Sequence, residues 1–257
     1  MSPLQPVEPR PAATVMVIRD GTGGPEILLL LRSRKAGFFP SAWVFPGGRV
    51  DPADEHVPKK GAIEGLDASQ EAFAVAAIRE CFEETGVWLG QGHPGDALRS
   101  ELNARTATLL DEPGLVADLD CLRLWSWWVT PEVEPRRYDT GFFLAVVDRG
   151  LVAMHDREEI VDSAWRSVRE ALEAVEAGEL MVAPPTYRTL HELAPYDTVE
   201  QAFEAARHRR VRPICPRLEQ DGDEWVIVLP GDPSYPHPEP VTGPTRITFR
   251  QGRWWQS

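Results

Sequence analysis

The chain has 257 residues, of which 42% are hydrophobic, and its 40 Asp and Glu against 27 Lys and Arg give a formal net charge of −13. This length and composition predict a globular protein with a sizeable core. The excess of negative charge argues against non-specific binding to nucleic acid or to an anionic membrane, since both reward positive charge.

The N-terminal part of the chain predicts a loose arm followed by a hairpin. Residues 1–12 carry four prolines and no apolar stretch of the kind found in signal peptides. Residues 13–18 and 26–31 are apolar, and the glycine-rich residues 19–24 separate them, so we expect two antiparallel strands. The longest apolar run is too short to span a membrane. Three widely spaced cysteines indicate a reducing cytoplasm.

A short strand, a turn and a polar loop follow the hairpin. Residues 43–45 are Trp-Val-Phe and predict a strand, which the turn sequence Pro46-Gly47-Gly48 ends. Residues 49–67 are polar and contain two prolines, so we expect a loop there.

A helix is predicted between Ser69, a candidate N-cap, and Gly86, a candidate left-handed residue at the C-terminal end. Its apolar side carries Val75, Ile78 and Phe82. At about 100° per residue, three carboxylates lie together on the other side, namely Glu80, Glu83 and Glu84. Such a cluster repels itself unless a cation neutralises it, and carboxylate oxygens suit Mg²⁺ or Mn²⁺.

The remainder of the chain predicts a sheet between helices and then an added segment. We expect helices at residues 98–110, 162–177, 186–193 and 198–209, and strands at 122–129, 140–147, 225–229 and 246–249. This order predicts an α/β (α+β) fold with a mixed sheet sandwiched between helices. Residues 13–183 are expected to form the main domain. Residues 184–257 are expected to form a C-terminal extension, helical and then a hairpin, packed on that domain.

Three tryptophans in the strand at residues 122–129 offer surfaces on which a nucleobase can stack. They are Trp125, Trp127 and Trp128. Because side chains alternate along a strand, Trp125 and Trp127 are expected to share one face of the sheet, which favours a core position for at least one face.

The carboxylate helix carries a specific motif. Glu71, followed after seven residues by Arg79-Glu80-Cys81-Phe82-Glu83-Glu84-Thr85-Gly86-Val87, matches the second part of the Nudix box, so the chain resembles a Nudix hydrolase. Pro46-Gly47-Gly48 resembles the start of that box. Gly65, six positions before Glu71, formally offers an uninterrupted box, but no strand precedes it.

The two halves of the motif are further apart than in the family pattern. The usual spacing places the box glutamate six positions after the second glycine, at Asp54, whereas Glu71 lies 17 positions further on. We therefore expect an insertion at about residues 49–70. Such an insertion resembles the Nudix branch that includes the peroxisomal coenzyme A diphosphatases and bacterial relatives.

The resemblance implies a metal-dependent enzyme in which water attacks a diphosphate, with Mg²⁺ or Mn²⁺ as the cofactor. It implies that Glu80, Glu83 and Glu84 bind the metal and that Gly47 adds a backbone carbonyl. It also implies that Arg79 pairs with Glu71 and holds the loop against the helix, in support of the metal ligands.

The resemblance leaves the general base and the phosphate ligands open. The base is either a box glutamate such as Glu83 or a carboxylate from a distant loop. The distant candidates are Glu159, Glu158 and Glu132. The candidate phosphate contacts are Arg32, Arg34, Arg136 and Arg137, together with the backbone of Gly48.

The expected substrate is a nucleoside diphosphate linked to another group, with coenzyme A as the first choice. One alternative is a Nudix-fold sensor that binds a nucleotide metabolite without turnover, and another is a housecleaning nucleoside triphosphate pyrophosphohydrolase. The intact glutamate set argues against the sensor, and the insertion argues against the triphosphatase. The expected partners are the small-molecule diphosphate and, in a homodimer, a second copy of the chain, with neither nucleic acid nor membrane.

Overall fold

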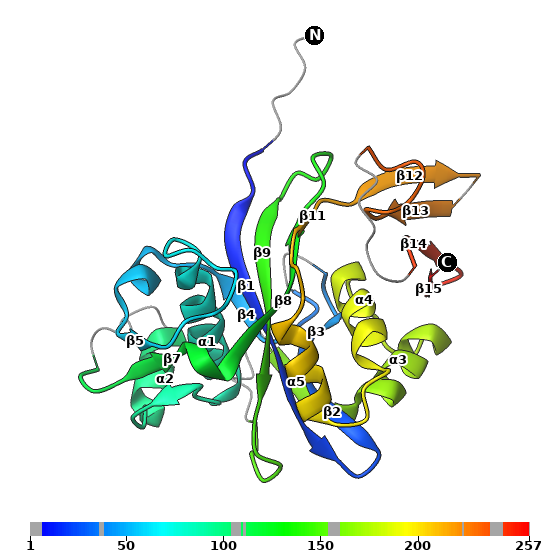
Figure 1. The fold of residues 1–257 in the computed structure, drawn as a ribbon. Coiled ribbons are helices and arrows are strands. Elements are labelled where there is room, and N and C mark those ends of the chain that lie inside the picture. Colours follow the sequence, from blue (N-terminus) through cyan, green and yellow to red (C-terminus); the bar gives the residue numbers. More distant parts are fainter. Residues whose placement is uncertain are drawn as a thin grey trace.

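A computed structural model describes residues 7–35, 39–103, 109, 112–153, 160–222, 224–236 and 244–256. Its centre is a mixed sheet of eight strands (Figure 1). These strands are β1 (Arg10–Gly21), β2 (Gly24–Arg32), β3 (Trp43–Val44), β4 (Gly47–Arg49), β8 (Leu122–Val129), β9 (Tyr138–Val146), β10 (Ile160–Ser167) and β11 (Pro213–Ile214). Their order is β10-β2-β1-β9-β8-β11, with β3 beside β2 and β4 beside β1.

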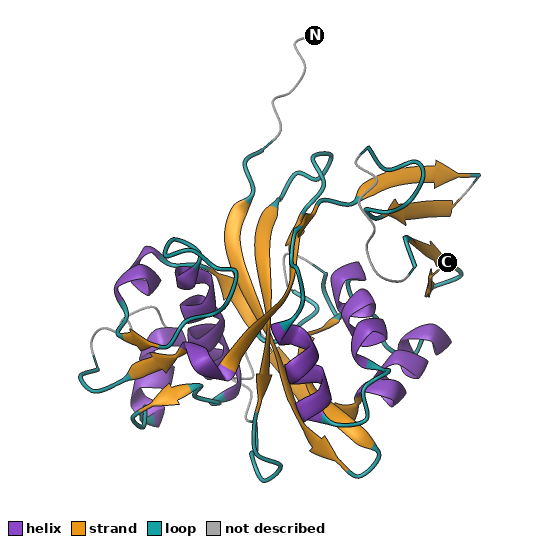
Figure 2. Cartoon of the chain, viewed as in Figure 1, coloured by secondary structure: helices purple, strands orange, loops and turns teal. Residues whose placement is uncertain are grey.

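Helices lie on both sides of this sheet (Figure 2). They are α1 (Glu71–Thr85), α2 (Asp96–Asn103), α3 (Val168–Ala177), α4 (Pro184–Leu193) and α5 (Val199–Arg207). Helix α1 packs on one face, and α3, α4 and α5 pack on the other. No helix in the described ranges is both long and apolar enough to cross a membrane.

Strand β1 shows how one sequence supplies both layers of the core. Val15 and Val17 belong to the apolar cluster that contains α1, whereas Met16 and Ile18 belong to the cluster that contains α3, α4 and α5. Successive side chains of a strand point to opposite faces, so an unbroken apolar run marks a strand that is covered on both sides. The predicted hairpin is confirmed by the antiparallel pairing of β1 with β2.

The N-terminal half of β1 extends further than the sequence predicts. The expectation of a loose arm to residue 12 is wrong for residues 10–12, because Arg10 to Ala12 align with Tyr138 to Thr140 of β9. On the other edge of β1, β4 pairs antiparallel with residues 12–14. This pairing holds the two glycines of β4 next to α1.

The predicted helix at residues 162–177 is wrong over its first turn and a half. Residues 160–167 form β10, in which Trp165 aligns with Leu28 of β2, and α3 begins only after Ser167. The Ser167 hydroxyl accepts from the backbone N–H of Glu170 at 3.5 Å. Ser167 and Glu170 have the spacing of a capping box, which marks the true start of the helix.

The three tryptophans of β8 do not follow simple alternation. The register between β8 and β9 shifts between Leu124 and Ser126. Trp125 and Trp128 consequently join the cluster beneath α3 to α5, and Trp127 joins the cluster beneath α1. The expectation that Trp125 and Trp127 share a face is wrong, because a β-bulge adds one residue to the alternation.

The predicted loop at residues 49–67 contains two short elements. A 3₁₀ helix spans Pro52–His56, and β5 (Lys59–Lys60) pairs with β7 (Val116–Asp118) in a small sheet completed by β6 (Gly90–Gln91). Lys60 and Asp118 form an ion pair of 2.7 Å across this sheet. The predicted helix at 98–110 is described as α2 and ends at Asn103, and residues 104–108 and 110 lie outside the described ranges.

The C-terminal segment contributes two helices and a second sheet. Helix α4 begins two residues earlier than expected, because Pro184 and Pro185 occupy its first turn, where a missing N–H costs nothing. The second sheet has the order β12-β13-β14-β15. Its strands are β12 (Arg217–Asp221), β13 (Glu224–Val228), β14 (Arg246–Arg250) and β15 (Arg253–Gln256). Of these, β13 and β14 were predicted, and β12 and β15 were missed.

Candidate active site

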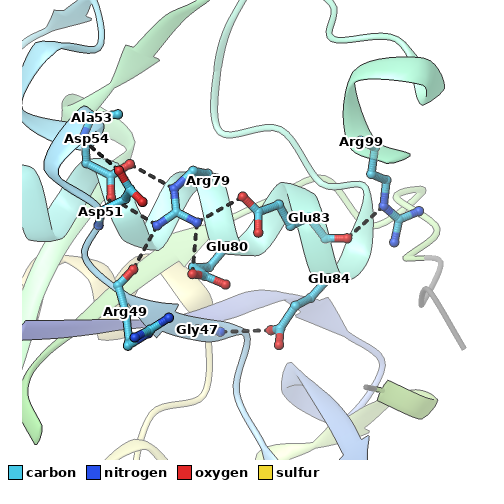
Figure 3. A network of polar contacts seen from close by, with 10 residues as sticks. All are labelled: Gly47, Arg49, Asp51, Ala53, Asp54, Arg79, Glu80, Glu83, Glu84 and Arg99. Carbon is cyan, nitrogen blue, oxygen red and sulfur yellow. Dashed lines mark hydrogen bonds and ion pairs between the residues drawn. The ribbon is translucent and has the colours of Figure 1, made fainter. Parts of the chain in front are cut away.

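Helix α1 presents its polar side toward β4 and the 3₁₀ helix (Figure 3). It ends at Gly86, which has the left-handed φ of 73° and whose N–H donates to the carbonyl of Phe82, as predicted. The expected N-cap at Ser69 is wrong, because α1 begins after Gln70. The backbone N–H groups of Ser69 and Gln70 both donate to Asp67 Oδ1 instead.

Arg79 lies at the centre of the site and uses all five of its N–H groups. Nε and Nη2 donate to the two carboxylate oxygens of Asp54 at 2.8 and 3.0 Å, and Nη2 also donates to the carbonyl of Arg49 at 2.8 Å. Nη1 donates to Glu80 and to Glu83, each at 2.9 Å. Burial alone lowers the pKa of Arg79, but the hydrogen bonds to Asp54 and the surrounding carboxylates raise it above its ordinary value.

The predicted pairing of Arg79 with Glu71 is wrong. Glu71 lies eight residues before Arg79 on the same helix, roughly 12 Å along the axis, and its carboxylate is 3.7 Å from Lys59 Nζ. Asp54 takes the place of Glu71 beside the arginine. It lies six positions after Gly48, which is the spacing that the box pattern gives to its acidic residue, so the inserted segment follows Asp54 and precedes α1.

The 3₁₀ helix holds Asp54 ready for this contact. The Asp54 side chain is 1% exposed and accepts from the backbone N–H of Asp51 at 2.7 Å, while Asp51 Oδ1 accepts from the N–H of Ala53 at 2.9 Å. This reciprocal cap fixes both the backbone and the carboxylate. A buried pair with two parallel hydrogen bonds combines charge with fixed geometry.

The three glutamates of the motif lie along one turn of α1, with Glu80 and Glu84 next to β4 and Glu83 next to Arg79. Glu80 and Glu83 are 15% and 14% exposed. Burial raises the pKa of Glu80 to about 7, against the opposing effect of Arg79, and the neighbouring Glu83 adds to the rise. Glu84 accepts a hydrogen bond from the backbone N–H of Gly47 at 2.9 Å. Glu80 and Glu83 share Arg79 with Asp54, and the raised pKa of Glu80 reflects how poorly this crowded site tolerates its charge, so the site favours an added cation.

The donor chemistry fits a hard divalent ion, because every side chain offered is a carboxylate. Gly48 leaves room for the Glu80 carboxylate, since a Cβ atom at position 48 would overlap that carboxylate. Within the described ranges, no three His, Cys, Asp or Glu side chains already converge in coordinating geometry. Arg79 Nη1 holds one oxygen of Glu80 and one of Glu83, and the N–H of Gly47 holds one oxygen of Glu84, so these contacts orient the three carboxylates along one turn of the helix.

Replacing Gly48 with Ala tests the contact between β4 and the helix. We expect the variant to fold, since the added methyl meets the end of a flexible side chain, but to lose about tenfold or more in Mn²⁺ affinity, because Glu80 is displaced. Calorimetric titration with Mn²⁺ measures this loss, with Gly23→Ala as the control, since a Cβ at Gly23 meets nothing within 4 Å. An unchanged Mn²⁺ affinity in Gly48→Ala contradicts the assignment of Glu80 to the ion.

A cavity of about 1120 Å³ adjoins the carboxylates. Glu80, Glu83 and Glu84 line it, and so do the backbone segments around Gly47 and Gly48. Several side chains that the sequence did not single out also line it, namely Arg10, Arg49, Glu134 and Tyr138. Of the three tryptophans of β8, Trp128 lines the cavity, but all three are buried, in agreement with the preference for core positions.

The predicted phosphate-binding arginines have different surroundings. Arg32 lines the cavity, whereas Arg34 and Arg136 are exposed and lie outside its lining. Arg137 is buried and donates to the carbonyls of Thr130 and Val7 at 3.0 and 2.8 Å, which is a structural role. Arg137 does not line the cavity, and its expected contact with phosphate stays a prediction.

The distant candidates for the general base are only partly described. Glu158 and Glu159 lie outside the described residues, and Glu132 is exposed and does not line the cavity. Glu134, in the same loop between β8 and β9, does line it. Glu134 lies only two residues after Glu132, and nothing in the sequence separates these two glutamates as candidates.

The chain is similar to known proteins. Residues 58–193 match the family described as the NUDT19 Nudix domain. Proteins named acyl-coenzyme A diphosphatase NUDT19 from Gallus gallus and Homo sapiens are each 29% identical to this chain. The matches cover 93% and 82% of this chain and 83% and 72% of those proteins.

The solved structures extend the agreement to the fold. A NUDIX hydrolase from Alicyclobacillus acidocaldarius has a TM-score of 0.71 and 30% sequence identity, over 77% of this chain and 96% of that chain. The predicted fold, a mixed sheet sandwiched between helices, is thereby confirmed.

Proposed function

Because this chain belongs to the Nudix hydrolase family, we propose that it cleaves the diphosphate bond of coenzyme A and of its thioesters. The choice of substrate rests on the residues that line the cavity. Carboxylates and arginines line it, and so do apolar side chains such as Trp225, Ile227 and Phe249. A substrate with a charged diphosphate and a long neutral arm matches this mixed lining, and the relatives named acyl-coenzyme A diphosphatase support the choice.

The proposed reaction is a hydrolysis without redox change. Water attacks one phosphorus of the diphosphate, the bond from that phosphorus to the bridging oxygen breaks, and the bridging oxygen leaves with the other phosphate. The products are adenosine 3′,5′-bisphosphate and 4′-phosphopantetheine, with the acyl group still attached when the substrate is a thioester. The difficulty is electrostatic, since negative charge accumulates on a group that already repels the nucleophile.

Glu80, Glu83 and Glu84 are the residues proposed to hold Mg²⁺ or Mn²⁺, with the carbonyl of Gly47 beside them. Divalent ions, when bound, supply positive charge that offsets the charge of the diphosphate and of the transition state. Arg79 orients Glu80 and Glu83 through Nη1, and it is itself held by Asp54. It is a positioning residue, because its five N–H groups are already used within the protein.

Other side chains of the cavity wall complete the proposed site. Arg10, Arg32 and Arg49 line the cavity, and their positive charge favours a phosphate-bearing ligand there. The proton of the attacking water needs a carboxylate acceptor, and Glu83 and Glu134 are the two that we propose. Asp54 is unsuited, because both of its oxygens accept hydrogen bonds from Arg79.

The test is a substrate panel with the purified chain in Mg²⁺ or Mn²⁺. The panel contains coenzyme A, acetyl-coenzyme A, NADH, ADP-ribose, a nucleotide sugar and nucleoside triphosphates. We expect the highest kcat/KM on coenzyme A or its thioester and loss of activity with EDTA, restored by excess metal. Tight binding of a panel compound without turnover supports the sensor, and preference for triphosphates supports the housecleaning enzyme. Either result overturns the proposed substrate.

A further inference from the structure

The C-terminal sheet has one continuous apolar face. Its register places Ile227 of β13 between Leu218 of β12 and Ile247 of β14. The next row along the same face aligns Trp225 with Phe249. Phe249 in turn aligns with Trp254 of β15, and the centres of these two rings are 4.7 Å apart. Since residues two apart in a strand share a face, these side chains form one surface across four strands.

This surface is fixed to the rest of the protein at one end. Trp254 is buried, and its indole N–H donates to the carbonyl of Val182 at 2.8 Å. Ile227 and Ile247 belong to the same apolar cluster as the strands beneath α3 to α5. Arg188 of α4 also donates to the carbonyl of Pro244. The sheet therefore forms a fixed wall beside the central sheet.

The other end of the surface is exposed on the active-site cavity. Trp225 is 56% exposed and Phe249 is 36% exposed, and both line the cavity that contains Glu80 and Glu83. Large aromatic side chains that remain exposed on a cavity wall mark a place where a ligand excludes water. The opposite face of the same sheet carries another exposed tryptophan, Trp255, which does not line the cavity.

We propose that the aromatic pair Trp225 and Phe249 binds the acyl chain of a coenzyme A thioester and so sets a preference for long thioesters over free coenzyme A. This inference rests on the proposed function and adds the part of the protein that selects the substrate. The cavity continues from the carboxylates to this wall, and its volume of about 1120 Å³ exceeds what a typical drug-sized ligand needs. A nucleoside triphosphate or ADP-ribose has no apolar arm that this wall would contact.

The inference predicts a dependence on chain length. Each methylene that leaves water for an apolar surface contributes at most about a fourfold gain in kcat/KM. The experiment measures kcat/KM for coenzyme A and its acetyl, hexanoyl and decanoyl thioesters in the native chain, Trp225→Ala, Phe249→Ala and Trp255→Ala. We expect kcat/KM to rise with chain length in the native chain. In Trp225→Ala and Phe249→Ala, we expect the ratio of decanoyl thioester to free coenzyme A to fall about tenfold or more.

Trp255→Ala is the matched control, since it removes an exposed tryptophan from the same sheet, and its chain-length ratio should equal that of the native chain. Equal ratios in all four proteins overturn the inference, as does a uniform loss on every substrate in Trp225→Ala, which indicates a structural role.

Calorimetric binding of decanoyl-coenzyme A and coenzyme A separates the two proposals. If neither is hydrolysed, the proposed function fails. The inference then stands only if the native chain binds the decanoyl thioester more tightly and Trp225→Ala does not.

Discussion

Replacing Glu83 with Gln is expected to lower kcat for diphosphate hydrolysis by about 100-fold or more, because removal of one essential electrostatic group typically costs that much. Gln has the same size and keeps a carbonyl oxygen that can accept from Arg79 Nη1, as the native carboxylate does at 2.9 Å. The substitution therefore removes a charge from the site and leaves the packing of α1 unchanged. Steady-state kinetics at saturating Mg²⁺ or Mn²⁺ give kcat, and thermal unfolding checks the fold.

Glu173→Gln serves as the control for this substitution, because Glu173 is an exposed residue of α3 on the other side of the sheet. Its kcat should match that of the native chain. If Glu83→Gln retains kcat within about threefold of the native value, Glu83 is not part of the reaction and the assignment of the carboxylate cluster to catalysis is wrong.

Replacing Asp54 with Ala is expected to lower the free energy of unfolding by about 3 kcal/mol, the low end of the range for removing one partner of a buried ion pair. The low end applies because Glu80 and Glu83 remain next to Arg79. The loss arises because the Nε and Nη2 groups of the buried Arg79 each lose the carboxylate oxygen that accepts their hydrogen bond. Urea unfolding followed by circular dichroism measures it, and activity should fall as well, since Arg79 orients two of the proposed metal ligands.

Glu71→Ala distinguishes the two possible partners of Arg79. Glu71 is a quarter exposed and its carboxylate is 3.7 Å from Lys59, so its removal should cost less than about 1 kcal/mol. A larger loss of stability in Glu71→Ala than in Asp54→Ala would show that the pairing implied by the sequence motif is the correct one.

Local patterns in the sequence predicted the central elements of this fold. The β1–β2 hairpin, the bounds of β8 and the carboxylate side of α1 follow from periodicity and from glycine or proline at the ends, which act within a few residues. The motif of Arg79, Glu80, Glu83 and Glu84 predicted the side of the helix that faces the cavity for the same reason. These features depend on neighbours in the sequence, so one chain is enough to find them.

Contacts between distant segments were not predictable in the same way. Asp54 and Arg79 are brought together by the 3₁₀ helix and β4. The spacing from Gly48 pointed to Asp54, but Glu71 has the spacing of the motif from Arg79, and only the fold decides between the two acids. The strand β10 was missed because polar residues such as Asp162 and Ser163 resemble a helix start, while its partner β2 lies far away in the chain. Among the described residues, the strand β12 pairs with β13 alone, and the short, polar pattern of residues 217–221 gives little β signal of its own.

The bidentate contact of Arg79 with Asp54 has a consequence for how this protein tolerates changes in length. The contact closes a loop whose variable part is residues 55–70, and loop-closure entropy grows only with the logarithm of length, by about 0.6 kcal/mol per doubling. That cost is small beside the roughly 3 kcal/mol expected from the ion pair. A longer or shorter segment between Asp54 and α1 is therefore expected to leave the geometry around Arg79 unchanged, because Asp54 comes before that segment and not after it.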